Sequence, residues 1–226
     1  MAKELLKMEG ITKIYGNGFM ANKDITFTVN EGEIHALIGE NGAGKTTLMK
    51  ILFGLENCQQ GKIYLDGKEV HIENPLDAIA KGVGMVHQHF MLVPNLSVAE
   101  NVVLGIEPGP GQIFDKKTAV RMTEEASEKF QLKVDPNALV RDISVGLKQK
   151  VELLKALIRG AKVLILDEPT AVLTPQEVRE LFVQLKSLKA NGYGIIFISH
   201  KLDEVMELCD SATVLRHGRV TGFVKK

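Results

Sequence analysis

A glycine-rich loop between a predicted strand and a predicted helix constrains the fold of this chain more than any other feature. The apolar run 34–38 predicts a buried strand, and residues 46–55 predict the helix that follows. Between them stands Gly39-Glu40-Asn41-Gly42-Ala43-Gly44-Lys45-Thr46-Thr47. A strand, a glycine-rich turn and a helix in this order are typical of a phosphate-binding loop. The loop therefore predicts an α/β fold with a nucleotide site.

The chemistry of this loop follows from its residue types. Glycines let backbone N–H groups turn toward an anion, and the N-terminus of the following helix adds partial positive charge. We expect Lys45 to reach the β- and γ-phosphates of a nucleotide and the Thr46 hydroxyl to bind Mg²⁺. The alternative, a glycine-rich turn with an incidental lysine, is disfavoured by the strand and the helix on either side.

The composition is that of one compact, soluble α/β domain. The chain has 226 residues, with 28 basic and 28 acidic side chains and a formal net charge of zero. A neutral chain offers no overall electrostatic footprint for nucleic acid or an anionic membrane. Residues 1–10 do not resemble a signal peptide, and no apolar run reaches the roughly 20 residues of a membrane span, so we expect a cytosolic chain. Cys58 and Cys209 form no CxxC pair, and we interpret them as ordinary reduced thiols.

Polar residues follow three further apolar runs. The run 83–86 is followed by His87-Gln88, the run 163–166 by Asp167-Glu168, and the run 194–198 by Ser199-His200. Each run predicts a buried parallel strand. Ligands of an open parallel sheet bind outside the carboxyl ends of its strands, so we expect these residues to meet the phosphate loop at one edge.

Each of these polar residues has a predicted role in nucleotide hydrolysis. Asp167 suits Mg²⁺ or its water ligands, and Glu168 would polarise the attacking water. His200 would donate to the γ-phosphate while contacting Glu168, and the amide of Gln88 would sense both metal and water. A lone His or Gln after a strand is commonly a satisfied loop residue, but convergence with Lys45 and Asp167 favours function.

Residues 92–160 predict a helical subdomain inserted between the strands. Residues 118–130 are rich in helix formers. Apolar side chains recur at helical spacing at Leu147, Val151, Leu154 and Ile158. Ser144 is the predicted N-cap of this second helix, and with the small Gly146 it predicts a second anion site. A purely structural N-cap explains the same residues equally well. The segment Pro108-Gly109-Pro110-Gly111 predicts a local break within the subdomain.

Taken together and in this order, the phosphate loop, Gln88, the Ser144 segment, Asp167-Glu168 and His200 resemble the nucleotide-binding domain of ATP-binding cassette (ABC) proteins. The resemblance covers essentially the whole chain and implies one domain over 1–226 with the P-loop NTPase fold of ABC ATPases. In that fold, 1–91 and 161–226 form a RecA-like core with a mainly parallel sheet and an N-terminal antiparallel β subdomain, and 92–160 form the helical subdomain with the signature motif. The resemblance also implies a head-to-tail dimer, with ATP between the phosphate loop of one cassette and Ser144 and Gly146 of the other. Tyr15 matches the aromatic residue that stacks on adenine in this family.

A finer resemblance is to the ATPases of importers for simple sugars and nucleosides. It rests on residues 86–94, 144–149 and 167–174, of which the first leans toward the nucleoside branch. It implies an ATP hydrolase, dependent on Mg²⁺, that energises uptake of a nucleoside or simple sugar from the cytoplasmic, inner face of the cell membrane. The implied partners are two membrane permease subunits, docked in a groove near Gln88 and residues 89–95, and a solute-binding lipoprotein or receptor. Such ATPases usually hold two cassettes in one chain, so we expect either the first cassette of a longer protein or a half-size relative that forms homodimers.

The competing interpretation is a soluble ABC ATPase that acts on ribosomes or nucleic acid. Translation factors with two cassettes are the hardest of these to exclude, and the basic linker that would indicate one does not occur in this sequence. A third interpretation is a regulatory half-site that binds ATP without hydrolysing it. Glu168 and His200 argue against that role, whereas the departures in the signature segment leave it open for a composite site.

Three residues depart from the general family pattern and match the sugar and nucleoside branch. Val145 stands where the first signature glycine is common, Leu147 replaces the usual Gln, and Thr174 replaces the usual Asp. Thr174-Pro175-Gln176-Glu177 also predicts a capping box that opens a helix. We therefore interpret Thr174 as a helix cap rather than as a catalytic group.

Overall fold

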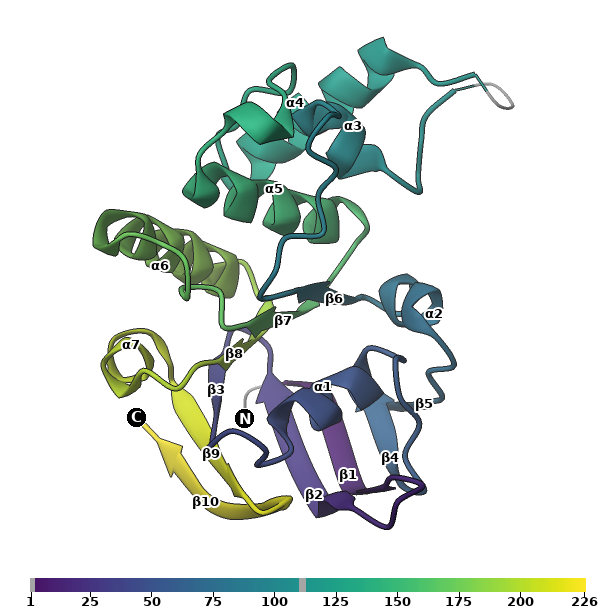
Figure 1. Ribbon diagram of the computed structural model, residues 1–226, viewed down its shortest axis with the longest axis vertical. Coiled ribbons are helices and arrows are strands. Elements are labelled where there is room, and N and C mark those ends of the chain that lie inside the picture. The colour runs from purple at the N-terminus through teal and green to yellow at the C-terminus, as the bar shows by residue number, and fades with distance from the viewer. Residues whose placement is uncertain (1–2, 110–112) are drawn as a thin grey trace.

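The computed structural model describes residues 3–109 and 113–226. Two sheets form the lower part of the molecule in Figure 1, and the helices within residues 98–158, here called the helical layer, lie above them. The antiparallel sheet has the order β2-β1-β4-β5, formed by β1 (Glu4–Ile14), β2 (Met20–Asn30), β4 (Gln60–Leu65) and β5 (Lys68–Val70). The larger sheet has the order β10-β9-β3-β8-β7-β6, formed by β3 (Ile34–Ile38), β6 (Val83–Val86), β7 (Val163–Asp167), β8 (Gly194–Ile198), β9 (Ser211–Arg216) and β10 (Arg219–Lys225). The helices are α1 (Lys45–Leu52), α2 (Pro75–Ala80), α3 (Val98–Val103), α4 (Lys116–Phe130), the short 3₁₀ helix η1 (Val140–Asp142), α5 (Val145–Ile158), α6 (Pro175–Ala190) and α7 (Leu202–Leu208).

The larger sheet is mainly parallel. Strands β9, β3, β8, β7 and β6 run parallel to their neighbours, and β10 pairs with β9 in the antiparallel direction. The parallel strands predicted at 34–38, 83–86, 163–166 and 194–198 are confirmed, as is the antiparallel sheet near the N-terminus. Because these strands point the same way, the polar residues that follow β6, β7 and β8 lie at one edge of the sheet.

Side chains of the larger sheet alternate between two hydrophobic clusters. Leu164 and Leu166 of β7 belong to a cluster with residues of α5 and α6, whereas Ile165 belongs to a cluster with α1 and the antiparallel sheet. Phe197 of β8 is fully buried in the first cluster. Successive side chains of a strand point to opposite faces, so the larger sheet is covered on both sides.

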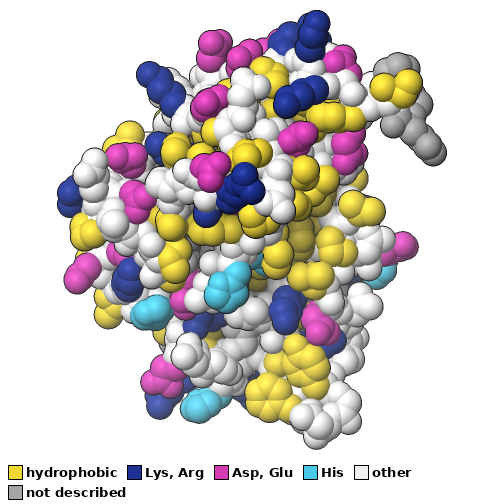
Figure 2. All heavy atoms as spheres, turned by 45° about the horizontal axis from the view of Figure 1, so that its top comes forward, with side chains coloured by type: hydrophobic (Ala, Val, Ile, Leu, Met, Phe, Trp, Pro, Cys, Tyr) yellow, Lys and Arg dark blue, Asp and Glu magenta, His cyan; other side chains and the backbone are white. Residues whose placement is uncertain are grey.

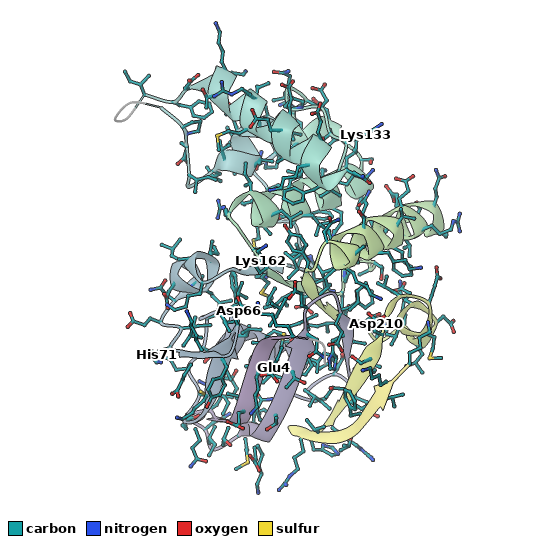
Figure 3. All side chains as sticks on the ribbon, turned by 180° about the vertical axis from the view of Figure 1, so that it is seen from behind. Glu4, Asp66, His71, Lys133, Lys162 and Asp210 are labelled. Carbon is teal, nitrogen blue, oxygen red and sulfur yellow. The ribbon has the colours of Figure 1, made fainter. Side chains whose placement is uncertain are left out.

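Asp210 ties the start of β3 to the elements around it. Figure 3, which views the molecule from behind, shows Asp210 beside β9 and α7. Its carboxylate accepts the N–H of Ile34 at 2.9 Å and pairs with Lys189 of α6. These contacts hold the strand that leads into the phosphate loop.

Two predicted helices have different bounds in the structure. Helix α1 ends at Leu52 rather than at residue 55, because Gly54 takes a φ of 74° and donates its N–H to the carbonyl of Ile51 at 3.1 Å. Helix α4 begins at Lys116, before the predicted residue 118, because the Asp115 side chain caps its first turn.

Helix α6 begins as the sequence predicts. Thr174 is its N-cap, Pro175 is its first residue, and Glu177 completes the capping box. Pro110 and Gly111 of the predicted break near α3 lie outside the described residues. Among the residues that the structure describes, no helix combines the length and the apolar character needed to cross a membrane.

Candidate functional site

The phosphate loop turns sharply into α1. Gly44 caps the helix with a φ of 102°, and a Cβ at this position would lie 2.4 Å from the carbonyl oxygen of Ala21, so glycine is required here. The Lys45 side chain folds back over the loop, where its Nζ donates to the carbonyls of Gly39 at 2.5 Å and Glu40 at 3.0 Å. The ammonium group therefore stays beside the loop that would surround a phosphate.

A cavity of about 320 Å³ opens in front of this loop. It brings together predicted site residues from three segments that are far apart in the sequence. These residues are Asn41, Gly42, Ala43, Gly44, Lys45, Thr46, Thr47, Gln88, Asp167 and Glu168. The ends of β6 and β7 thus meet the phosphate loop at the predicted edge of the sheet.

Glu168 is held between the ends of neighbouring strands. Its N–H donates to the carbonyl of Ile198 at 3.0 Å, and its φ of 47° is a left-handed conformation that few residues other than glycine adopt. Its Oε1 lies 3.1 Å from Nδ1 of His200, and its Oε2 accepts from Nε2 of Gln88 at 3.4 Å. The expected contact between His200 and Glu168 is therefore present. The positive φ of Glu168 is a strained backbone conformation of the kind that is common at functional sites.

Two adjacent carboxylates, those of Asp167 and Glu168, lie at this edge with the ammonium group of Lys45. Burial raises the pKa of Asp167, and the adjacent Glu168 carboxylate raises it further. Burial lowers the pKa of Lys45, against the attraction of both carboxylates. Carboxylate, hydroxyl and amide oxygens are the donors that Mg²⁺ prefers. Asp167, Thr46 and Gln88 therefore suit this cation, whose charge would offset that of the paired carboxylates.

The cavity also contains an aromatic residue that the sequence analysis missed. Phe19, in the turn between β1 and β2, lines the cavity with an exposed side chain. Tyr15 does not line it, although its ring stacks with that of Phe19 at 6.4 Å between centroids and its hydroxyl lies 3.4 Å from Oγ1 of Thr47. The stacking of Tyr15 on adenine stays a prediction. The signal for Phe19 was a second aromatic residue in the same glycine-rich turn.

Ser144 and Gly146 lie away from this cavity, at the start of α5 in the helical layer. Ser144 is the N-cap of α5, as predicted, and its Oγ accepts the N–H of Leu147 at 3.2 Å. The N–H of Gly146 donates to Oε1 of Glu177, on α6, at 2.9 Å. Neither Ser144 nor Gly146 lines the cavity in front of the phosphate loop.

A second cavity, of about 150 Å³, lies between the helical layer and the larger sheet. Its lining is mostly apolar and includes Met91, one of the residues 89–95 near which the sequence predicts a docking groove. Figure 2 shows hydrophobic side chains gathered on this face between the two parts of the molecule. Helix α5 contributes charged residues to the wall, namely Glu152, Lys155 and Arg159.

Comparisons with known proteins agree with this geometry. Residues 22–171 match the family model described as ABC transporter. The nucleoside import ATP-binding protein NupA of Lactococcus lactis is 50% identical over 220 residues, which cover 97% of this chain and 43% of that protein. The guanosine import ATP-binding protein NupO of Bacillus subtilis is 50% identical over 215 residues, which cover 95% of this chain and 42% of that protein. The chain thus spans less than half the length of these curated relatives.

A solved structure extends the likeness to the fold. It shows an ATP-binding cassette of an ABC transporter in its ADP conformation. The two chains superpose with a TM-score of 0.87 and are 26% identical, with 99% of this chain and 91% of the other covered.

Proposed function

Because this chain belongs to the ABC transporter family, we propose that it is the ATP-binding and ATP-hydrolysing cassette of an importer for a nucleoside or a simple sugar. The observation that carries this proposal is the meeting of the phosphate loop, Gln88 and the Asp167-Glu168 pair at one cavity. Its solute class is supported by the similarity to relatives named for nucleoside and guanosine import.

Nucleotide binding is the task of the phosphate loop. Its N–H groups and Lys45 bind the β- and γ-phosphates of ATP, and Lys45 exchanges its present carbonyl partners for phosphate oxygens. Thr46, Asp167 and Gln88 would hold Mg²⁺, which would supply positive charge to offset that of the phosphates.

Hydrolysis depends on the carboxylate of Glu168. It takes the proton of the attacking water, and its two oxygens are oriented by His200 at 3.1 Å and Gln88 at 3.4 Å. The His200 side chain is 62% exposed, so its imidazole is accessible to a γ-phosphate. A donor in that position stabilises the charge that develops on the phosphate.

A second cassette completes the site. Ser144 and Gly146 of one cassette face the ATP held by the phosphate loop of another, either in a homodimer or in one chain with two cassettes. Two membrane permease subunits dock at the cavity between the helical layer and the larger sheet, on the inner face of the cell membrane. A solute-binding lipoprotein or receptor delivers the solute to them.

The partners of the natural protein test this proposal. The full-length protein would be recovered from gently solubilised membranes and every partner identified by mass. We expect two hydrophobic permease subunits, with or without a solute-binding lipoprotein. Ribosomal or DNA-bound partners without permeases would support the competing class, an ABC ATPase that acts on ribosomes or nucleic acid, and would overturn the importer assignment while leaving the ATP site intact.

A further inference from the structure

Two charged side chains of α5 hold both backbone polar groups of a single loop residue. Oε1 of Glu152 accepts the N–H of Met91 at 2.5 Å, and Nζ of Lys155 donates to the carbonyl of Met91 at 3.0 Å. Glu152 and Lys155 are three residues apart on the helix, so they lie on one face of it. Met91 belongs to the loop that joins β6 to α3. One helix face therefore fixes both the position and the orientation of this loop residue.

Met91 is also the point where the loop passes from the hydrolytic site to the helical layer. Three residues earlier, Gln88 contacts Glu168 at the ends of the strands. Two residues later, Val93 is bonded to α3, because Oδ1 of Asn101 accepts its N–H at 2.7 Å and Nδ2 of Asn101 donates to its carbonyl at 3.1 Å. Only residues 89 and 90 separate Gln88 from Met91. A displacement of α5 is therefore carried to Gln88 over a very short length of chain.

The stability of the fold does not explain a carboxylate at position 152. Glu152 is only 5% exposed, and burial raises its pKa despite the opposing charge of Lys155 and the bond from Met91. Desolvation of a buried ion pair commonly exceeds the attraction between its members, so replacing both members by apolar side chains of similar volume is often neutral or stabilising, whereas removing one member alone is destabilising. What the carboxylate provides and an apolar side chain does not is a directional acceptor for the N–H of Met91.

We propose that Glu152 is a positioning residue that, together with Lys155, couples the helical layer to Gln88 and so sets the contact of Gln88 with Glu168. This inference rests on the proposed function, since the position of Gln88 matters for catalysis only if Glu168 acts in ATP hydrolysis. When α5 shifts relative to the larger sheet, Met91 follows it through two hydrogen bonds, and the amide of Gln88 moves toward or away from the carboxylate of Glu168.

Steady-state ATP hydrolysis by the full-length protein with its partners tests this coupling. Glu152→Gln keeps an acceptor for the N–H of Met91 and should retain kcat within about twofold. Glu152→Met removes the acceptor and should lower kcat by about tenfold, the order expected for one lost hydrogen bond to a charged group. The loss should fall mainly on kcat rather than on the KM for ATP, because Lys45 and the N–H groups of the phosphate loop, which bind the phosphates, are untouched. Glu180→Gln is the matched control, since Glu180 contacts Lys150 of α5 at 3.3 Å but no residue of the loop, and it should behave as wild type.

Urea unfolding of the same variants separates positioning from a structural role. We expect Glu152→Met to unfold at a lower urea concentration than wild type, because the N–H of Met91 loses its acceptor, but to be fully folded in the assay buffer. A loss of kcat in the folded protein then reports positioning, whereas a purely structural residue would lower stability and leave the kcat of the folded protein unchanged. Wild-type kcat in Glu152→Met, or equal losses in the Gln and Met variants, would overturn the inference and leave the proposed function standing. If the wild-type protein does not hydrolyse ATP at all, the proposed function itself fails.

Discussion

Two glycines of the phosphate loop provide a matched test of how the loop is built. Gly42 and Gly44 both have positive φ, at 80° and 102°. A Cβ added to Gly42 meets no atom within 4 Å, whereas one added to Gly44 would lie 2.4 Å from the carbonyl oxygen of Ala21 and 2.6 Å from Nδ2 of Asn22. Alanine strains the backbone at either position, but only Gly44→Ala also crowds β2.

The two variants should therefore differ in stability. Left-handed backbone costs an alanine about 1–2 kcal/mol, and overpacking against a neighbour costs about 1–3 kcal/mol more. Alanine also reduces the freedom of the unfolded chain, but this effect is similar in both variants and cancels in their comparison. We expect Gly42→Ala to lose about 1–2 kcal/mol of the free energy of unfolding and Gly44→Ala about 2–5 kcal/mol.

Urea unfolding followed by circular dichroism measures both losses. Gly16→Ala is the control, because its added Cβ meets open space without a positive φ, and it should unfold as wild type does. Binding of a fluorescent ATP analogue to the same samples should be weakest for Gly44→Ala, since a displaced loop no longer presents its N–H groups together. Equal losses of stability in the two loop variants would refute the reasoning, because the contact with Ala21 would then carry no cost.

Three further substitutions test the site and the charge distribution. Glu168→Gln should trap an ATP-bound dimer with slow turnover, measured by light scattering and phosphate release, and rapid hydrolysis would remove Glu168 from its proposed role. Lys45→Ala should abolish ATP binding in a calorimetric titration, and unaltered affinity would contradict the assignment of the phosphate loop. The third concerns Glu33: burial raises its pKa, but the neighbouring His35 and hydrogen bonds from Ser211 and from the N–H of Asn30 lower it from 4.5 to about 2. Because the folded-state pKa lies below the unfolded one, this carboxylate stabilises the fold above pH 4.5 by about 3 kcal/mol and loses that contribution as the pH falls toward 2. Glu33→Gln should flatten that dependence in urea unfolding measured between these limits, and an unchanged slope would show that another group causes it.

The strand ends of the site could be predicted because buried parallel strands have a plain signature. A strand covered on both faces is a continuous apolar run, and the residues after it are polar because they reach the edge of the sheet. Asp167 and Glu168 follow such a run, and they line the cavity as that argument requires. The end of α1 at Leu52 was also available from the sequence, since Gly54 is a standard signal for a helix C-terminus.

Contacts between distant segments could not be predicted in this way. Met91 and Glu152 are 61 residues apart, and Gly146 and Glu177 are 31 residues apart. Both contacts depend on the angle at which α5 crosses its neighbours, which follows from packing in three dimensions and leaves no local pattern. Phe19 was missed for a similar reason, because the conformation of its turn decides whether it points into the cavity.

Burial decides which of these two contacts of α5 opens more easily. Glu177 is half-buried, so water can replace it at the N–H of Gly146, and its Oε2 still accepts the N–H of Thr174 at 2.9 Å. Glu152 is almost fully buried, and its separation from Met91 would leave a charge without that partner in a mostly apolar cavity. A small tilt of α5 therefore releases Gly146 before it releases Met91. The first turn of α5 would then change its partner while the link to Gln88 is kept, as the proposed sharing of a nucleotide between two cassettes needs.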